Sequence, residues 1–112
     1  MDKRVVESYM PMADEAIKNV LGNEKIDKTY RSKLSAFGAA VIMSGLLPAL
    51  AYYQKNEKKV IELLEDMYKQ LPDKELNEGG LFELAKKKKE EDLKELIINF
   101  SISLKLVMNL YI

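Results

Sequence analysis

The longest stretch without a charged side chain, residues 34–54 (LSAFGAAVIMSGLLPALAYYQ), constrains this chain most. Charged residues make up 32% of the protein, so an uncharged run of this length predicts a segment that other parts of the chain cover. Ser44 and Gly45, followed closely by Pro48, indicate a stop and restart between two helices. About 20 apolar residues can also cross a bilayer, so insertion of residues 34–53 into a membrane is one alternative. The interior serines, glycines and proline favour two buried helices joined by a tight turn.

The overall composition restricts the chemistry that is open to the protein. With 112 residues, the chain 1–112 is expected to form a single domain. Eighteen basic and eighteen acidic side chains cancel, so nucleic acid or anionic lipid could be bound only through a local patch. The absence of cysteine and histidine removes disulfides, thiolate nucleophiles and most transition-metal sites. Residues 1–21 carry no recognisable secretion signal, so a cytoplasmic location is expected.

Apolar residues recur at spacings of three or four along most of the chain, which predicts an all-α fold. Asp2, Asp27 and Asn56 are placed to cap helices, and Pro11 predicts a kink or short break inside the first one. Residues 73–80 are polar and contain glycine, which indicates a loop. The predicted fold is a compact single-domain bundle of five or six helices with a central buried helix.

The helix that follows Asp27 is the expected central one. Its first half has charged residues opposite an apolar line, whereas its second half replaces the charged residues with Gly38, Ala39 and Ile42. A helix that is apolar on every side is normally enclosed by its neighbours. We therefore expect the second half of this helix to be covered.

The sequence predicts no catalytic residue, metal site or cofactor, and therefore a protein that is not an enzyme. Without histidine or cysteine the common nucleophile and base arrangements are unavailable. Carboxylates in the predicted helices have lysines within one turn, as on an ordinary solvated surface. Gly79 and Gly80 lack the lysine and the preceding strand of a phosphate-binding loop. No small-molecule substrate is expected.

Two basic features could meet phosphate groups. Residues 86–89 are four lysines, but four acids follow within six residues, which is typical of a solvated helix start. The second feature combines the start of the central helix with the junction of the third and fourth helices, and residues 28–54 contain no acid. If these two ends lie side by side, they form a positive patch at one edge of the bundle. The predicted RNA-binding residues are Lys28, Arg31, Lys33, Lys55, Lys58 and Lys59.

Residues 30–55 (YRSKLSAFGAAVIMSGLLPALAYYQK) resemble the small α-helical subunit of the type III-B (Cmr-type) CRISPR RNA-guided effector complex. That family shows an aromatic and basic start, a helix of small and apolar residues, and a Gly-Leu-x-x-Ala-Leu-Ala-aromatic segment before a lysine. Residues 45–52 match this segment. The chain departs from the family near its C-terminus, where Ser-Ile-Ser-Leu at residues 101–104 stands in place of a Glu-Ala-Leu segment followed by tryptophan and basic residues.

The resemblance implies a non-catalytic, structural role in antiviral defence. Several copies would stack along the larger subunits that hold the guide RNA, and their basic surfaces would line the groove for the target RNA. The partners implied are therefore other subunits, copies of the chain itself, guide RNA and target RNA, with no membrane. The alternative is a helical adaptor that binds only protein, with residues 38–42 receiving a partner helix.

Overall fold

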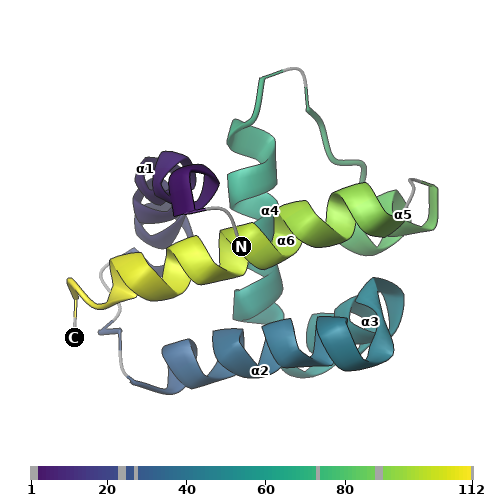
Figure 1. Cartoon of the computed structure of the whole chain (residues 1–112), viewed down its shortest axis with the longest axis horizontal. Helices are drawn as coiled ribbons and strands as arrows, with labels where there is room; N and C mark the ends of the chain where they lie inside the picture. The colour runs from purple at the N-terminus through teal and green to yellow at the C-terminus, as the bar shows by residue number, and fades with distance from the viewer. Residues whose placement is uncertain (1–2, 23–24, 27, 73, 88–89, 112) are drawn as a thin grey trace.

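The computed structural model describes residues 3–22, 25–26, 28–72, 74–87 and 90–111. All regular structure within these ranges is helical, which confirms the all-α prediction (Figure 1). The helices are α1 (Lys3–Leu21), α2 (Lys28–Ser44), α3 (Leu46–Asn56), α4 (Lys58–Gln70), α5 (Gly80–Lys87) and α6 (Glu90–Met108). None of these helices has the length and apolar character that a bilayer span requires.

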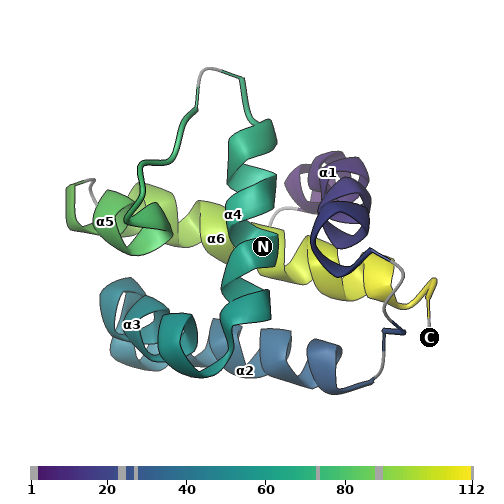
Figure 2. The same ribbon diagram turned by 180° about the vertical axis from the view of Figure 1, so that it is seen from behind.

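Two antiparallel helices, α2 and α6, lie side by side on one face of the bundle (Figure 1). Helix α4 crosses behind them, and the reverse view shows it between α1 on one side and α3 with α5 on the other (Figure 2). Helix α4 contacts all five other helices. The central position therefore belongs to α4, and not to α2 as the sequence suggested.

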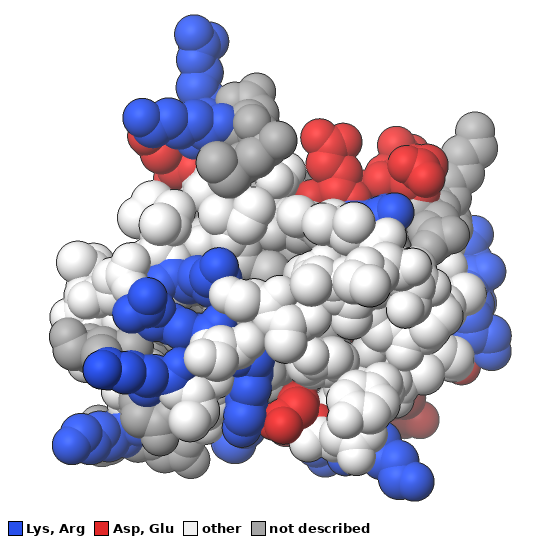
Figure 3. Space-filling model, turned by 60° about the horizontal axis from the view of Figure 1, so that its bottom comes forward, with Lys and Arg blue, Asp and Glu red and all other residues white. Residues whose placement is uncertain are grey.

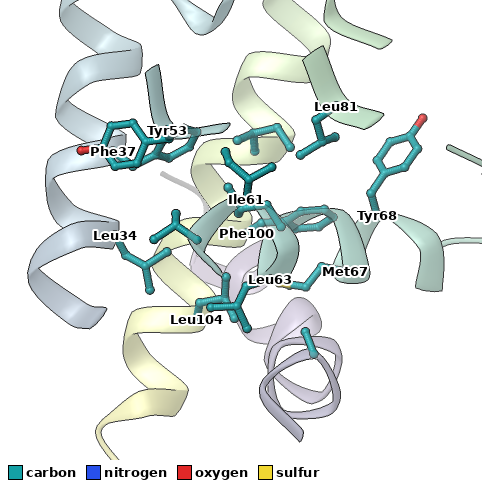
Figure 4. Packing of buried hydrophobic residues seen from close by; sticks show 14 of the residues in the cluster. Leu34, Phe37, Tyr53, Ile61, Leu63, Met67, Tyr68, Leu81, Phe100 and Leu104 are labelled. Atoms are coloured by element: carbon teal, nitrogen blue, oxygen red, sulfur yellow. The ribbon is translucent and has the colours of Figure 1, made fainter. Parts of the chain in front are cut away.

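The core surrounds α4 and takes buried side chains from all six helices. Apolar residues of α4 recur with the predicted helical period, and Ile61, Leu64 and Met67 are fully buried. They pack with side chains such as Leu34 of α2 and Phe100 of α6 (Figure 4). Complete burial of one such side chain contributes roughly 1.5–3 kcal/mol, so this cluster fixes how the helices cross.

Helix boundaries follow the sequence signals in some places and depart from them in others. Gly45 has φ 95° and separates α2 from α3, which confirms the predicted stop and restart. The predicted cap at Asn56 is wrong, because Asn56 is the last residue of α3 and its side-chain amide donates to the Tyr52 carbonyl at 2.9 Å. Glu57 separates α3 from α4 instead. The predicted caps at Asp2 and Asp27 lie outside the described residues.

Helix α1 runs without a break through Pro11, so the predicted short break is wrong, whereas the alternative, a kink, stays a prediction. Pro11 is exposed, on the side where water can solvate the carbonyl that loses its amide partner. Val6 before the proline and Ala13 and Ile17 after it are buried, and their packing holds both halves in one helix. Residues 74–78 have no regular structure, as expected for a loop.

The second half of α2 is exposed on one side, which contradicts the expectation that neighbours enclose it. Ile42 is 65% exposed and Met43 is 84% exposed. Only Leu34, Phe37 and Val41 of this helix are buried. Small side chains in this half leave an open groove between α2 and α6, and no other helix covers this groove in the described part of the chain.

Candidate nucleic-acid interface

A basic groove lies between the start of α2 and the end of α6. Residues 28, 31, 32 and 35 fall on one side of α2 because they are three or four positions apart. Lys105, in the last turn of α6, faces them across the groove. The cavity has a volume of about 400 Å³ and is lined by Lys28, Arg31, Ser32, Ser35 and Lys105. We refer to it as the basic groove.

The lining of the basic groove suits a phosphate group. Lys28, Arg31 and Lys105 make no ion pair with any carboxylate that the structure describes. The guanidinium group offers up to five donors in a fixed plane, and the two serine hydroxyls add short donors beside it. Figure 3 shows lysine and arginine side chains gathered over the start of α2.

Lys33 lies on a different side of α2 and does not line the basic groove. Its ammonium group is 3.0 Å from the Glu57 carboxylate and 5.6 Å from the centre of the Tyr30 ring. This ion pair joins α2 to the junction of α3 and α4. The two ends of the predicted patch are therefore neighbours, which was the condition for a joint patch, but the Glu57 carboxylate lies between them.

The remaining predicted cations, Lys55, Lys58 and Lys59, are exposed around the α3–α4 junction. The Lys59 ammonium is 3.8 Å from the Glu62 carboxylate. Glu57 and Glu62 therefore partly neutralise the charge of these three lysines. The structure thus places two of the six predicted residues in the basic groove, pairs Lys33 with Glu57, and leaves three on a flank, where Lys59 pairs with Glu62.

Lys105 is the member of the basic groove that the sequence did not reveal. It lies more than 70 positions from Arg31, and nothing in the local pattern shows that α6 packs beside α2. The apolar residues that recur at spacings of three or four between residues 93 and 111 do not include Lys105, and only the pairing of α2 with α6 gives it basic neighbours. Lys105 could have been predicted as part of the basic groove only if the antiparallel contact between α2 and α6 had been known.

The lysine run at residues 86–89 shows the ordinary features of a solvated helix. The Lys86 ammonium is 3.3 Å from the Glu83 carboxylate and 5.7 Å from the centre of the Phe82 ring. Lys87 is exposed, and residues 88–89 lie outside the described part of the chain. Helix α5 joins the opposite end of α6 from the basic groove (Figure 1).

The pKa shifts of ionisable side chains are explained by hydrogen bonds, ion pairs and burial outside the basic groove. Asp14 accepts a hydrogen bond from the Tyr111 hydroxyl and pairs with Lys18 at 3.1 Å, and these contacts lower its pKa. Burial raises the pKa of Tyr53. No group of three or more acidic side chains among the described residues could hold a metal ion. The basic groove is therefore the feature that best indicates a ligand.

The fold and the groove define the chain as a small all-α protein with one open basic groove among the described residues. In the comparison with protein families, residues 7–108 match the model of the family described as CRISPR-associated protein (Cas_Cmr5). The chain belongs to this family, which comprises small subunits of the type III-B Cmr complex. The predicted resemblance is confirmed. Searches of curated proteins and of solved structures gave no significant match.

Proposed function

We propose that this protein is a non-catalytic subunit of a CRISPR RNA-guided effector complex that contacts target RNA through the basic groove. Membership of the Cmr5 family supports the place in the complex. The observation that supports RNA contact is the meeting of Lys28, Arg31 and Lys105 in one open groove without a carboxylate in its lining. Such a site holds phosphates and does not read bases.

The cations outside the groove have a secondary role in this proposal. Lys55, Lys58 and Lys59 extend the positive surface past Glu57, where a backbone that leaves the groove would pass. Lys33 holds the two parts together through its ion pair with Glu57. Several copies would lie along the larger subunits that carry the guide RNA, and the zero net charge allows such copies to lie near one another without general repulsion.

The test is a triple charge reversal of the basic groove, K28E/R31E/K105E. Binding of single-stranded RNA to the protein, alone and in the assembled complex, is measured against salt concentration. Each phosphate contact on a single strand contributes about 0.7 to the slope of log affinity against log salt, so losing three contacts should lower the slope by about 2. Circular dichroism should show unchanged helicity.

The matched control reverses three exposed lysines on other helices, K3E/K69E/K87E. It changes the net charge by the same amount and leaves the groove intact, so RNA binding should keep its salt slope. A second variant, K55E/K58E/K59E, measures the flank and should have a smaller effect than the groove variant. Equal RNA retention by the groove variant and the control would refute the proposed RNA site.

A second candidate function, that of an adaptor that binds only protein, is favoured by a neighbouring apolar groove. This groove has a volume of about 280 Å³ and continues the basic groove along α2 and α6. Its lining includes Gly38, Ala39 and Ile42, the surface predicted to receive a partner helix. In that case wild type and the groove variant would both fail to bind RNA, alone and in the complex.

A further inference from the structure

The exposed side of α6 carries a stripe whose chemistry changes in order along the helix. Glu91, Glu95, Ile98, Ile102 and Lys105 are three or four positions apart, so they fall on one face. Along this face the order is acid, acid, apolar, apolar and base. A stripe with opposite charges at its two ends and an apolar centre is complementary to itself when a second copy is reversed.

The surface around this stripe repeats the same order on a wider scale. An acidic hollow of about 310 Å³ at the start of α6 is lined by Glu91, Asp92, Lys94, Glu95, Ile98 and Asn99. The apolar groove follows and shares Ile98 with that hollow, and it shares Ser35 and Lys105 with the basic groove. Figure 3 shows an uncharged expanse beside the clustered lysines and arginines, with acidic side chains along one edge.

The apolar centre of this surface has the exposure expected of a contact site. Ile42, on the α2 wall of the apolar groove, is 65% exposed, and the adjacent Met43 is 84% exposed. Ile98 and Ile102 form the α6 wall and are half-buried. Apolar side chains grouped in this way mark interaction sites more often than single exposed ones do.

We infer that two copies of this chain pair face to face across α2 and α6, about a twofold axis midway between Ile98 and Ile102. With a rise of about 1.5 Å per residue, Glu95 and Lys105 lie about 7.5 Å from this midpoint in opposite directions. An antiparallel pair therefore places Glu95 of each copy opposite Lys105 of the other. Ile98 likewise meets Ile102. A twofold interface of this kind uses the same patch on both copies.

Charge complementarity identifies the occupant as a second copy. The cations at one end of the surface, Lys28, Arg31 and Lys105, match the three acids at the other end, Glu91, Asp92 and Glu95. Both ends are satisfied at once only when the partner carries the same order in reverse. A closed pair of this kind differs from an open row of copies, and it covers the basic groove.

The pair is a state of the free chain and does not depend on the proposed role in RNA binding. If both hold, RNA and the second copy compete for the same cations. The free chain would then keep its apolar groove and its basic groove covered until it is assembled with other partners. The mass of the protein without RNA tests the pair independently of RNA binding.

The test is sedimentation equilibrium of the full chain without RNA over a range of protein concentrations. Wild type should fit a monomer–dimer equilibrium with no larger species. The variants K28E/R31E/K105E and E91K/D92K/E95K each place like charges opposite each other, so each should dimerise at least tenfold more weakly. An equimolar mixture of the two variants should restore dimers, because one copy is then acidic at both ends and the other basic.

Two further variants keep the test independent of folding. Acids in the first turn of a helix also favour its dipole, so I42E, at a largely exposed position, is included and should abolish dimerisation with unchanged helicity. The control K3E/K69E/K87E should dimerise like wild type. A monomeric wild type at all concentrations, an open series of larger masses, or no association in the mixture of variants would each overturn the inference.

Discussion

Gly45 holds a backbone conformation that other residues rarely adopt. Its φ of 95° and ψ of 163° fall in a region open almost only to glycine, and a side chain there costs of the order of 1–3 kcal/mol. The turn lies between buried Val41 and Leu46, so the chain cannot relax without moving core residues. We expect Gly45→Ala to lower the free energy of unfolding by about 1–3 kcal/mol, measured by urea denaturation.

Gly38 provides the matched control, because it lies inside α2 where a methyl group would meet no atom within 4 Å other than the adjoining backbone of its own helix. Gly38→Ala should raise the free energy of unfolding by about 0.5–1 kcal/mol, since alanine restricts the unfolded chain more than glycine. Equal effects of the two substitutions would show that the conformation of Gly45 carries no strain for alanine.

At the scale of single residues, local rules predicted the turn but not every cap. The spacing of Ser44, Gly45 and Pro48 identified the α2–α3 turn because glycine and proline act through their own backbone. Asn56 has a side chain suited to capping, yet it bonds to the preceding turn of α3. The choice between these two local bonds depends on how α3 and α4 pack, which one residue cannot reveal.

Helix α5 depends on a contact from another helix. It has eight residues, and isolated helices of that length are unstable in water. Glu65 of α4 accepts a hydrogen bond from the Leu81 amide at 2.9 Å, at the end of α5 where free amides need acceptors. This carboxylate therefore fixes the start of α5 after the loop of residues 74–79.

We expect Glu65→Ala to destabilise the fold by about 1–2 kcal/mol, the usual cost of losing an N-terminal cap. Amide hydrogen exchange should increase first in α5, because the contact is local to its start. Glu65→Gln keeps an acceptor oxygen and should retain most of the protection. Unchanged exchange in α5 for the alanine variant would contradict this role of Glu65.

At the scale of helices, the sequence pattern distinguishes the buried face of α4 but does not show which side of the second half of α2 is covered. The stripe of α4 has polar residues on its other side, so its buried face was evident from the sequence. The second half of α2 has apolar or small residues on every side, and a pattern without contrast does not show whether a helix is covered. Ile42 and Met43 are exposed, since only the side that carries Phe37 and Val41 is buried in the core.

For the whole molecule, the sequence predicted the fold class, but it left open whether the two basic ends are neighbours and did not predict the composition of the basic groove. Net charge and the acid-free run of residues 28–54 indicated where cations are left without acids nearby in the sequence. Glu57 and Lys105 enter through tertiary contacts, one neutralising Lys33 and the other completing the groove. Such contacts depend on which helices pair.

The pH dependence of stability is a property of the whole molecule. The chain contains no histidine. Histidine is the side chain that ordinarily titrates between about pH 5 and 8, so we expect a constant free energy of unfolding from about pH 6 to 8. Changes at either extreme come from groups such as Asp14, Lys18 and Tyr111, which tie the C-terminal end to α1.

The sign at each extreme follows from these three groups. The hydrogen bond from Tyr111 and then the contact with Lys18 lower the pKa of Asp14, so its contribution is present at neutral pH and lost as pH falls through that lowered pKa. The same hydrogen bond raises the pKa of Tyr111, and Asp14 raises the pKa of Lys18. Their contributions are lost as pH rises through those raised values.

We expect the free energy of unfolding of each protein to be constant near neutral pH, with a constant difference between Tyr111→Phe and wild type. Tyr111→Phe should lower the free energy of unfolding by a constant amount from about pH 6 to 8, and that difference from wild type should shrink below the plateau and above it. Tyr52→Phe alters an exposed tyrosine in α3, away from Asp14, and should match wild type throughout. Urea denaturation at a series of pH values measures all three proteins. A Tyr111→Phe difference that changed within the plateau would show that another group, and not Asp14, controls this contact, because neither member of the pair titrates there.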